Sequence, residues 1–115
     1  MVLGAFGAHG LASLEGMTPR MLETWDTAVF YHLVHGVVLL LLAVIGMQKA
    51  KIKWLFRIYL IFIGGMLLFS GSLYALVLGA PSWVGPITPL GGTLFIAGWT
   101  MLSLSALTSA KNQPD

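Results

Sequence analysis

Three long stretches of this chain contain no Asp, Glu, Lys or Arg, and they constrain the fold more than any other feature. They cover residues 27–47, 58–79 and about 90–110. A helix needs about 20 predominantly apolar residues to cross the hydrocarbon core of a bilayer. With 57% hydrophobic and only 9% charged residues, the chain is too poor in charge to cover a surface that faces water. The sequence therefore predicts three complete transmembrane helices surrounded by the lipid bilayer.

The amino-terminal segment, residues 1–14, is apolar and glycine-rich but too short to cross a bilayer alone. It lacks the charged start and the cleavage site of a signal peptide. Gly4, Ala8 and Ala12 recur at the four-residue spacing of a helix-packing face. We expect the second half of a membrane helix, either because the start codon is assigned late or because the protein begins within the membrane. The predicted fold is an all-α transmembrane bundle of four helices, the first truncated, in one domain of 115 residues.

The positive charges predict the orientation of the bundle. The connection at residues 48–57 contains four basic residues and no acid, namely Lys49, Lys51, Lys53 and Arg57. The connection at residues 80–89 has no charge, and residues 15–26 carry three acids against one base. Because basic residues concentrate in cytoplasmic loops, we expect loop 48–57 and the carboxyl terminus to be cytoplasmic.

Small residues recur on one face of each complete span. In the second span they are Gly64, Gly71, Ala75 and Gly79, and in the third Gly91, Gly98 and Ser105 recur every seven residues. Such faces let helix backbones approach closely in lipid, so we expect helix packing there.

Several residues predict where helices begin and end. Thr18 followed by Pro19 is a good N-cap and first-turn pair, from which a helix could run into the first complete span. The prolines of the uncharged connection, Pro81, Pro86 and Pro89, are expected to break any helix there. Three tryptophans lie near predicted span ends, where indoles favour the headgroup region, namely Trp25, Trp54 and Trp83.

The histidines are the main candidates for function, because an ionisable residue inside a membrane is a functional hypothesis by default. His32 and His35 are three residues apart and so share a helix face. Three roles stay open for them: hydrogen bonds between helices, handling of protons or a small ligand, and metal or haem ligation with His9 as a third ligand. No carboxylate lies near in sequence to orient a metal site.

The hydroxyl groups of Ser70, Ser72 and Tyr74 lie in the second complete span and are expected to hydrogen-bond within the bundle. Ser70 and Tyr74 join the three histidines as candidate functional residues. The chain has no cysteine, which excludes thiolate chemistry, and a net charge of +2 without a basic stripe, which argues against nucleic-acid binding. No catalytic constellation is recognisable, so we expect no enzymatic activity and assign no cofactor.

Four stretches together resemble one protein family. They are Gly4-Ala5-Phe6-Gly7-Ala8-His9, Trp25-Asp26-Thr27-Ala28 leading to Tyr31-His32-Leu33-Val34-His35, Phe69-Ser70-Gly71-Ser72-Leu73-Tyr74, and Ile87-Thr88-Pro89-Leu90-Gly91-Gly92 with Phe95-Ile96-Ala97-Gly98-Trp99. This pattern is similar to the YgdD/YwdK family of small integral membrane proteins. The resemblance implies a four-helix protein of the bacterial cytoplasmic membrane with no established activity. Family members have an apolar half-helix before the first motif, which this chain lacks.

The sequence therefore leaves three functions open. The first is a non-enzymatic membrane protein with a structural or partner-binding role, which includes a homo-oligomer or a complex with another membrane protein. The second is a transporter or channel for ions or small solutes, which would have to work as an oligomer because four short helices enclose too little volume. The third is a metal or haem protein that depends on the histidines.

Overall fold

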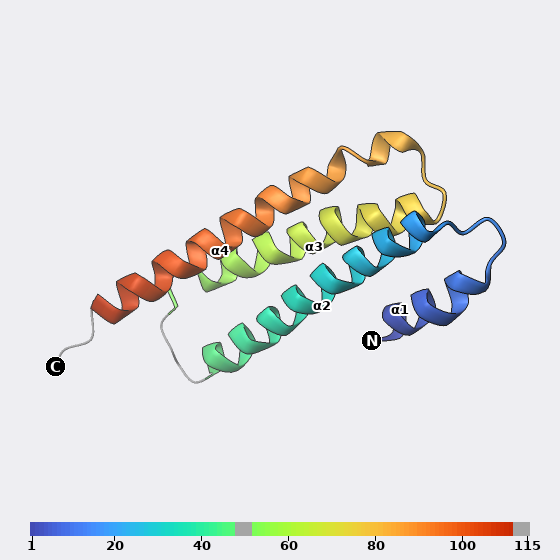
Figure 1. The fold of residues 1–115 in the computed structure, drawn as a ribbon. Helices are drawn as coiled ribbons and strands as arrows, with labels where there is room; N and C mark the ends of the chain where they lie inside the picture. Colours follow the sequence, from blue (N-terminus) through green and yellow to red (C-terminus); the bar gives the residue numbers. More distant parts are fainter. Residues whose placement is uncertain (48–51, 112–115) are drawn as a thin grey trace.

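The computed structural model describes residues 1–47 and 52–111, and this part of the chain consists of helices joined by turns and short connections, without a strand. Its four α-helices are α1 (Val2–Ala5), α2 (Pro19–Met47), α3 (Leu55–Val77) and α4 (Ile87–Lys111). Figure 1 shows them side by side in the order α1, α2, α3, α4. The last three are long and apolar enough to cross a membrane. The predicted all-α bundle of four helices is thus confirmed.

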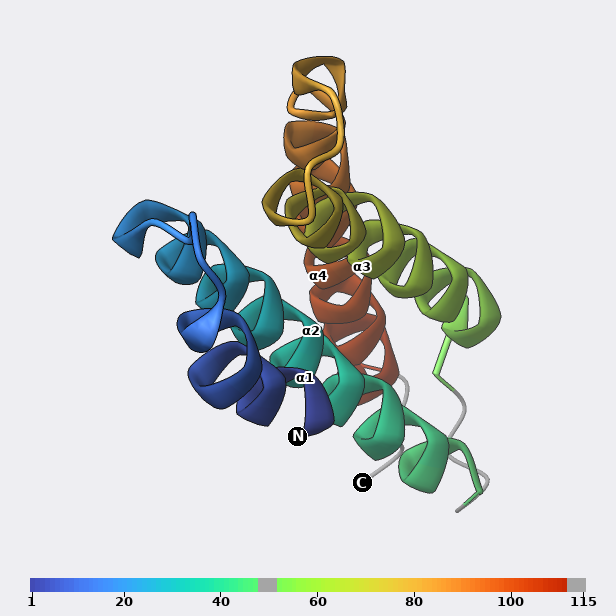
Figure 2. The same cartoon turned by 90° about the vertical axis from the view of Figure 1, so that its right-hand side faces the viewer.

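The amino-terminal helix is short and irregular. After α1 the chain continues through a π-helical turn (Phe6–Gly10) and a 3-10 turn (Leu11–Ser13). This helical run lies beside α2 (Figures 1 and 2). Its buried residues are Gly7 and Leu11, whereas Ala8 and Ala12 are exposed. The predicted packing face was therefore wrong at Ala8 and Ala12, whereas Gly4 is half-buried and faces Val29 of α2. The closest approach is at Gly7, where a side chain would collide with the indole of Trp25.

The helix ends follow local capping rules. The backbone N–H of Met21 donates to Oγ1 of Thr18 at 3.3 Å, so Thr18 caps α2 as expected. At the end of α3, Gly79 adopts φ +97°, which places it in the left-handed region that favours glycine. The N–H of Ala80 then donates to the carbonyl of Ala75 at 2.9 Å, as in a Schellman motif. Gly79 therefore ends the helix rather than extending a packing face.

The prediction that Pro89 breaks the helix was wrong. A short 3-10 turn (Ser82–Val84) follows Pro81, and α4 begins at Ile87, directly after Pro86. Pro89 lies in the first turn of α4. The backbone N–H groups of the first turn have no acceptor within the helix, so a residue without an N–H is tolerated there.

The helices α3 and α4 pack closely through glycines. A Cβ added at Gly91 would overlap the backbone nitrogen of Phe69, and one at Gly98 would lie 2.7 Å from the ring of Phe62. One heptad further along, Oγ of Ser105 donates to the carbonyl of Lys53 at 2.8 Å. The seven-residue series of the third span therefore faces α3, as the packing rule predicts. Gly71, by contrast, has open space beside it.

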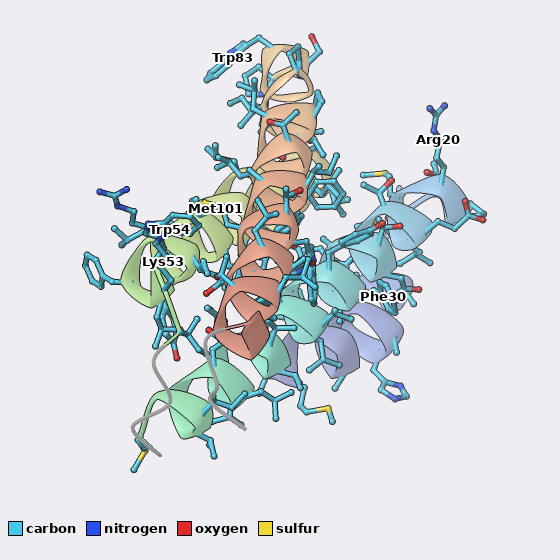
Figure 3. The ribbon with its side chains drawn as sticks, turned by 90° about the vertical axis from the view of Figure 1, so that its left-hand side faces the viewer. Arg20, Phe30, Lys53, Trp54, Trp83 and Met101 are labelled. Atoms are coloured by element: carbon cyan, nitrogen blue, oxygen red, sulfur yellow. The ribbon has the colours of Figure 1, made fainter. Side chains whose placement is uncertain are left out.

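The helices α2 and α4 do not pack backbone to backbone. They flank α3, and a buried cluster of Leu42, Ile58, Phe62 and Phe95 joins the three helices. The whole molecule is flat, with extents of 63 × 27 × 17 Å. At the start of α3, the ammonium of Lys53 lies 4.5 Å from the centre of the Trp54 ring (Figure 3). Residues 48–51, which include Lys49 and Lys51 of the predicted cytoplasmic loop, lie outside the described residues.

Candidate functional site

His35 lies in the middle of the bundle and is only 3% exposed. Its Nδ1 lies 2.8 Å from the carbonyl oxygen of Tyr31, to which it can only donate. Its Nε2 accepts a hydrogen bond from the indole Nε1 of Trp99 at 3.2 Å. The two bonds together require the neutral imidazole that carries its proton on Nδ1. The ring also stacks on Phe95, with 3.6 Å between ring centroids. Both nitrogens of His35 are thus engaged within the protein.

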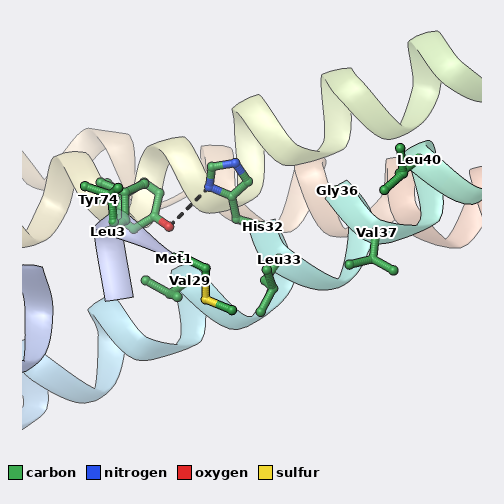
Figure 4. Close-up of a pocket in the computed structure, with 10 residues that line it drawn as sticks. Met1, Leu3, Val29, His32, Leu33, Gly36, Val37, Leu40 and Tyr74 are labelled. Atoms are coloured by element: carbon green, nitrogen blue, oxygen red, sulfur yellow. Dashed lines mark hydrogen bonds between the residues drawn. The ribbon is translucent and has the colours of Figure 1, made fainter. Parts of the chain in front are cut away.

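His32 faces a different part of the bundle, although it is only three residues away. Its Nδ1 lies 3.4 Å from the hydroxyl of Tyr74, at the long limit of a hydrogen bond (Figure 4). The ring of Tyr74 packs on Trp25 with 4.6 Å between centroids, and Trp25 donates to the carbonyl of Leu3 at 2.8 Å. His32 and Tyr74 therefore lie at the place where the amino-terminal helix, α2 and α3 come together.

Two serines of α3 have different surroundings. Oγ of Ser72 shares a hydrogen bond of 2.7 Å with Oγ1 of Thr88 and donates to the carbonyl of Phe69. Ser70 is 2% exposed, and its Oγ is the one buried side-chain polar atom of the described residues without a hydrogen-bond partner. Ser70 lines a cavity, whereas Ser72 faces the start of α4.

That cavity, which we call the His32 cavity, measures about 290 Å³ and lies between the amino-terminal helix, α2 and α3. Its lining residues are Leu3, His32, Ile63, Met66, Leu67, Ser70, Gly71 and Tyr74. A second cavity of about 470 Å³ adjoins it and shares Leu3, His32 and Tyr74 (Figure 4). The structure thus brings three of the five candidate residues, His32, Ser70 and Tyr74, around one space.

His9 does not join the other histidines. It is exposed on the π-helical turn Phe6–Gly10. Among residues 1–47 and 52–111, no group of three or more His, Cys, Asp or Glu side chains comes together. Since Nε2 of His35 is occupied by the Trp99 indole, the described residues do not form the three-histidine metal site that the sequence left open.

A groove separate from the His32 cavity lies between α2 and α4, and Phe69 of α3 lines one end of it. Its two halves are cavities of about 470 and 450 Å³, and Trp99 lines both. The first lies beside Tyr31, Gly92 and Ile96, and the second beside Val38, Leu41, Ile45, Leu102 and Ala106. We call this the α2/α4 groove.

Two residues that organise these sites were missed by the sequence analysis. Trp25 is 2% exposed and packs inside the protein, a role that the sequence analysis did not assign to it, whereas Trp83 is 69% exposed. The sequence analysis assigned no role to Trp99, although its indole N–H donates a hydrogen bond to His35 of α2. The small residue Gly7 in the amino-terminal segment is the one sequence signal that could have indicated a bulky neighbour.

Comparison with known proteins places this fold in a family. The family model described as "Protein of unknown function (DUF423)" matches residues 3–92. A UPF0382 membrane protein of Staphylococcus aureus is 44% identical over 108 residues, which cover 93% of this chain and 84% of the relative. The UPF0382 membrane protein YwdK of Bacillus subtilis is 42% identical over 91% of this chain and 84% of its own length.

The match extends beyond these two bacteria. A UPF0382 membrane protein of Haemophilus influenzae is 39% identical over 95% of this chain and 85% of the relative. No solved structure matches the chain. The resemblance to the YgdD/YwdK family is confirmed by the YwdK match. The chain therefore belongs to the DUF423 family of UPF0382 membrane proteins, whose function is unknown.

Proposed function

We propose that this protein has a structural, non-enzymatic role in the bacterial cytoplasmic membrane and that it assembles with a second copy of itself through the α2/α4 groove. The observation that carries the proposal is the groove itself. Two apolar cavities, each larger than 400 Å³, follow one another between two helices whose backbones do not pack together and which touch through the side chains of His35, Phe95 and Trp99. A transmembrane helix of a partner would fill this space with van der Waals contacts, which drive helix association in lipid.

A second copy is the favoured occupant because α4 carries both halves of a self-complementary surface. The groove wall on α4 includes Leu102 and the small residue Ala106. Beside it on the same helix, Leu104 and Leu107 form an exposed apolar ridge. A two-fold interface requires the same patch on both subunits, with each ridge facing the partner's groove. A groove next to a ridge on one helix meets that requirement.

The surroundings of His35 support a structural role over a catalytic one. Its ring stacks on Phe95 and uses both nitrogens for hydrogen bonds inside the chain. A general base must have a nitrogen within hydrogen-bond reach of its substrate. The His35–Trp99 bond instead ties the two walls of the groove together at its midpoint.

The experiment is a measurement of the monomer–dimer equilibrium in phosphatidylcholine liposomes by single-molecule photobleaching at a series of protein-to-lipid ratios. The chain has no native cysteine, so one dye can be attached at an introduced cysteine. Ala106→Trp fills the groove and Leu107→Ala removes part of the ridge. Each is expected to weaken dimerisation about tenfold, corresponding to about 1.4 kcal/mol.

Leu60→Ala and Leu60→Trp are the matched controls, because Leu60 is 54% exposed on α3 and lies outside the groove. They should leave the equilibrium unchanged. A protein that stays monomeric at all ratios, or dimers that tolerate Ala106→Trp as well as Leu60→Trp, would overturn the proposal.

We also propose that the α2–α3 connection and the carboxyl terminus face the cytoplasm. The basic residues Lys53 and Arg57 lie at the start of α3. The segment 15–26, which carries three acidic residues, lies toward the opposite end of the bundle (Figure 1). Basic residues favour the cytoplasmic side. In intact cells, a membrane-impermeant thiol reagent should label Ser82→Cys and leave Lys53→Cys unlabelled. The reverse labelling pattern would contradict this orientation.

A further inference from the structure

The start of α3 carries two exposed basic side chains, Lys53 directly before the helix and Arg57 in its first turn. All acidic residues among residues 1–47 and 52–111 belong to the segment 15–26. That segment lies about 30 Å away along α2, and charges more than about 10 Å apart are largely screened at 0.1 M salt. The counter-charge for Lys53 and Arg57 therefore does not come from the described residues.

Trp54 gives this end of α3 an unusual local structure. Its φ of +61° is the one positive φ of a non-glycine residue in the part of the chain that the structure describes. A bulky side chain is strained in that region, and such strain often marks a functional site. The ammonium of Lys53 lies 4.5 Å from the centre of the Trp54 ring, which is itself 38% exposed (Figure 3). The strained residue thus presents an indole and an ammonium together at the surface of the bundle.

A stripe of exposed apolar side chains runs along α3 from these charges. Its members recur every three or four residues and so share one helix face, namely Phe56, Leu60, Ile63 and Leu67. Arg57 lies three residues before Leu60 and is therefore beside the stripe. Ile58 and Phe62 point the other way, into the buried cluster that joins α2, α3 and α4. The stripe thus faces lipid acyl chains, and Lys53 and Arg57 mark its polar end.

This arrangement selects an anionic phospholipid over other occupants. A guanidinium donates two parallel hydrogen bonds to a phosphate, and an ammonium adds a point charge. An indole favours the level of the lipid head groups. The choline of phosphatidylcholine carries a positive charge, which two basic side chains disfavour. A soluble phosphate would use the two charges but would leave the apolar stripe without a partner.

We propose that the start of α3 binds an anionic phospholipid such as phosphatidylglycerol, whose phosphate is held by Lys53 and Arg57 and whose acyl chain lies along the stripe. Trp54 keeps the ammonium of Lys53 at the level of the head group. These residues do not line the α2/α4 groove. Vesicles with the same lipids in both leaflets offer the lipid to the site in either orientation of the protein. The proposal therefore depends neither on dimerisation nor on topology.

The test measures which lipid occupies the stripe, by fluorescence quenching with lipids that carry bromine on their acyl chains. A bimane fluorophore is attached to Ile63→Cys, since the chain has no native cysteine. The protein is reconstituted in mixtures of phosphatidylglycerol and phosphatidylcholine, with one or the other brominated. We expect phosphatidylglycerol to be preferred at this position by at least about fivefold, corresponding to about 1 kcal/mol.

The double variant Lys53→Gln/Arg57→Gln should abolish the preference, and both side chains are exposed, so the fold should be retained. Arg57→Gln alone should lower it at least about twofold. Arg20→Gln is the matched control, because it removes the same charge from an exposed residue at the opposite end of the bundle (Figure 3). It should leave the preference unchanged. A bimane at Phe30→Cys, on the exposed face of α2, should report no comparable preference.

Inorganic phosphate distinguishes a lipid head group from a soluble anion. At equal ionic strength it should lower the preference no more than sodium chloride does, because screening acts alike on both and phosphate offers nothing to the stripe. A larger loss with phosphate would overturn the proposal in favour of a soluble anion.

Two further results would overturn the proposal. One is equal quenching by the two brominated lipids at Ile63→Cys, which would mean that the stripe is covered by whatever lipid is present. The other is a preference that survives in Lys53→Gln/Arg57→Gln, or that Arg20→Gln lowers as much as Arg57→Gln, since the net charge of the chain would then be its cause.

Discussion

The indole of Trp99 in α4 donates a hydrogen bond to Nε2 of His35 in α2, across 3.2 Å. Phe62 of α3 lies against both rings, with centroid distances of 5.5 Å to His35 and 5.4 Å to Trp99. One polar bond and three rings therefore connect the three long helices at a single level. Because the backbones of α2 and α4 do not pack together, such side-chain contacts determine the separation of the two helices.

Trp99→Phe should destabilise the bundle, because it keeps most of the ring and leaves Nε2 of buried His35 without a donor. The expected loss is about 0.6 kcal/mol, and up to about 1.7 kcal/mol. The free energy of unfolding is measured by titration with sodium dodecyl sulfate, followed by circular dichroism. Trp83→Phe is the control, because Trp83 is 69% exposed. Equal losses in the two variants would show that the His35–Trp99 bond contributes no stability.

Gly91→Ala and Gly92→Ala form a pair of neighbouring glycine substitutions with opposite expectations. The new Cβ at position 91 would overlap the backbone of Phe69, whereas that at position 92 would lie 3.8 Å from its ring. Overpacking of a tight contact costs about 1–3 kcal/mol. Gly91→Ala should lose that much stability in the same unfolding titration, and Gly92→Ala should lose little. Similar losses for both would mean that α3 and α4 do not approach as closely as described.

Gly7→Ala should release the amino-terminal helix from α2 without unfolding the rest. A Cβ at Gly7 would lie 2.5 Å from the Trp25 indole, and one at Gly4 would lie 3.5 Å from Val29, an ordinary contact. Amide hydrogen exchange by mass spectrometry should therefore accelerate over residues 2–13 in Gly7→Ala and stay unchanged in Gly4→Ala. Exchange in α3 should be the same in both variants.

Removal of the hydrogen bond between Trp25 and Leu3 should loosen the same amino-terminal segment to a smaller extent. Trp25→Phe removes the donor of the 2.8 Å bond and keeps an aromatic ring beside Phe6 and Tyr74. If the bond contributes about 0.6 kcal/mol, exchange over residues 2–13 should rise about threefold. No rise would show that ring packing alone holds the segment.

Ser105→Ala should loosen the start of α3, because Oγ of Ser105 donates to the carbonyl of Lys53 across the bundle. Ser103→Ala is its control, since Oγ of Ser103 donates to Trp99 within its own helix. We expect a stability loss of about 0.6 kcal/mol for Ser105→Ala and a smaller one for Ser103→Ala. A larger loss for Ser103→Ala would contradict this assignment.

The features that depend on one stretch of chain could be predicted from the sequence. Charge-free length alone indicates the three long helices, and the Thr18–Pro19 pair indicates where α2 begins. The heptad spacing of Gly91, Gly98 and Ser105 likewise identifies a face before its partner is known.

The remaining features of the fold and of the candidate site depend on contacts between helices. Rules based on one stretch of sequence do not predict such contacts. Ser70 and Ser72 are the same residue type two positions apart, yet Thr88 of α4 bonds only Ser72. His32 and His35 were expected to share a face, but residues three apart on a helix still differ by about 60° in direction, which is enough to give them different neighbours, Tyr74 and Trp99. Trp25 is buried because Phe6 and Tyr74 cover it. The preference of indoles for the headgroup region does not predict these contacts.

The position of Trp25 has a consequence for the order of assembly during synthesis. Its indole contacts Phe6 on the amino-terminal helix and Tyr74 near the end of α3. A ribosome makes these two partners at different times, since α3 follows α2 in the chain. Membrane helices insert first and associate afterwards. The amino-terminal segment therefore completes its docking only after α3 has entered the bilayer, so a segment made before α2 and α3 reaches its final place after both of them have inserted.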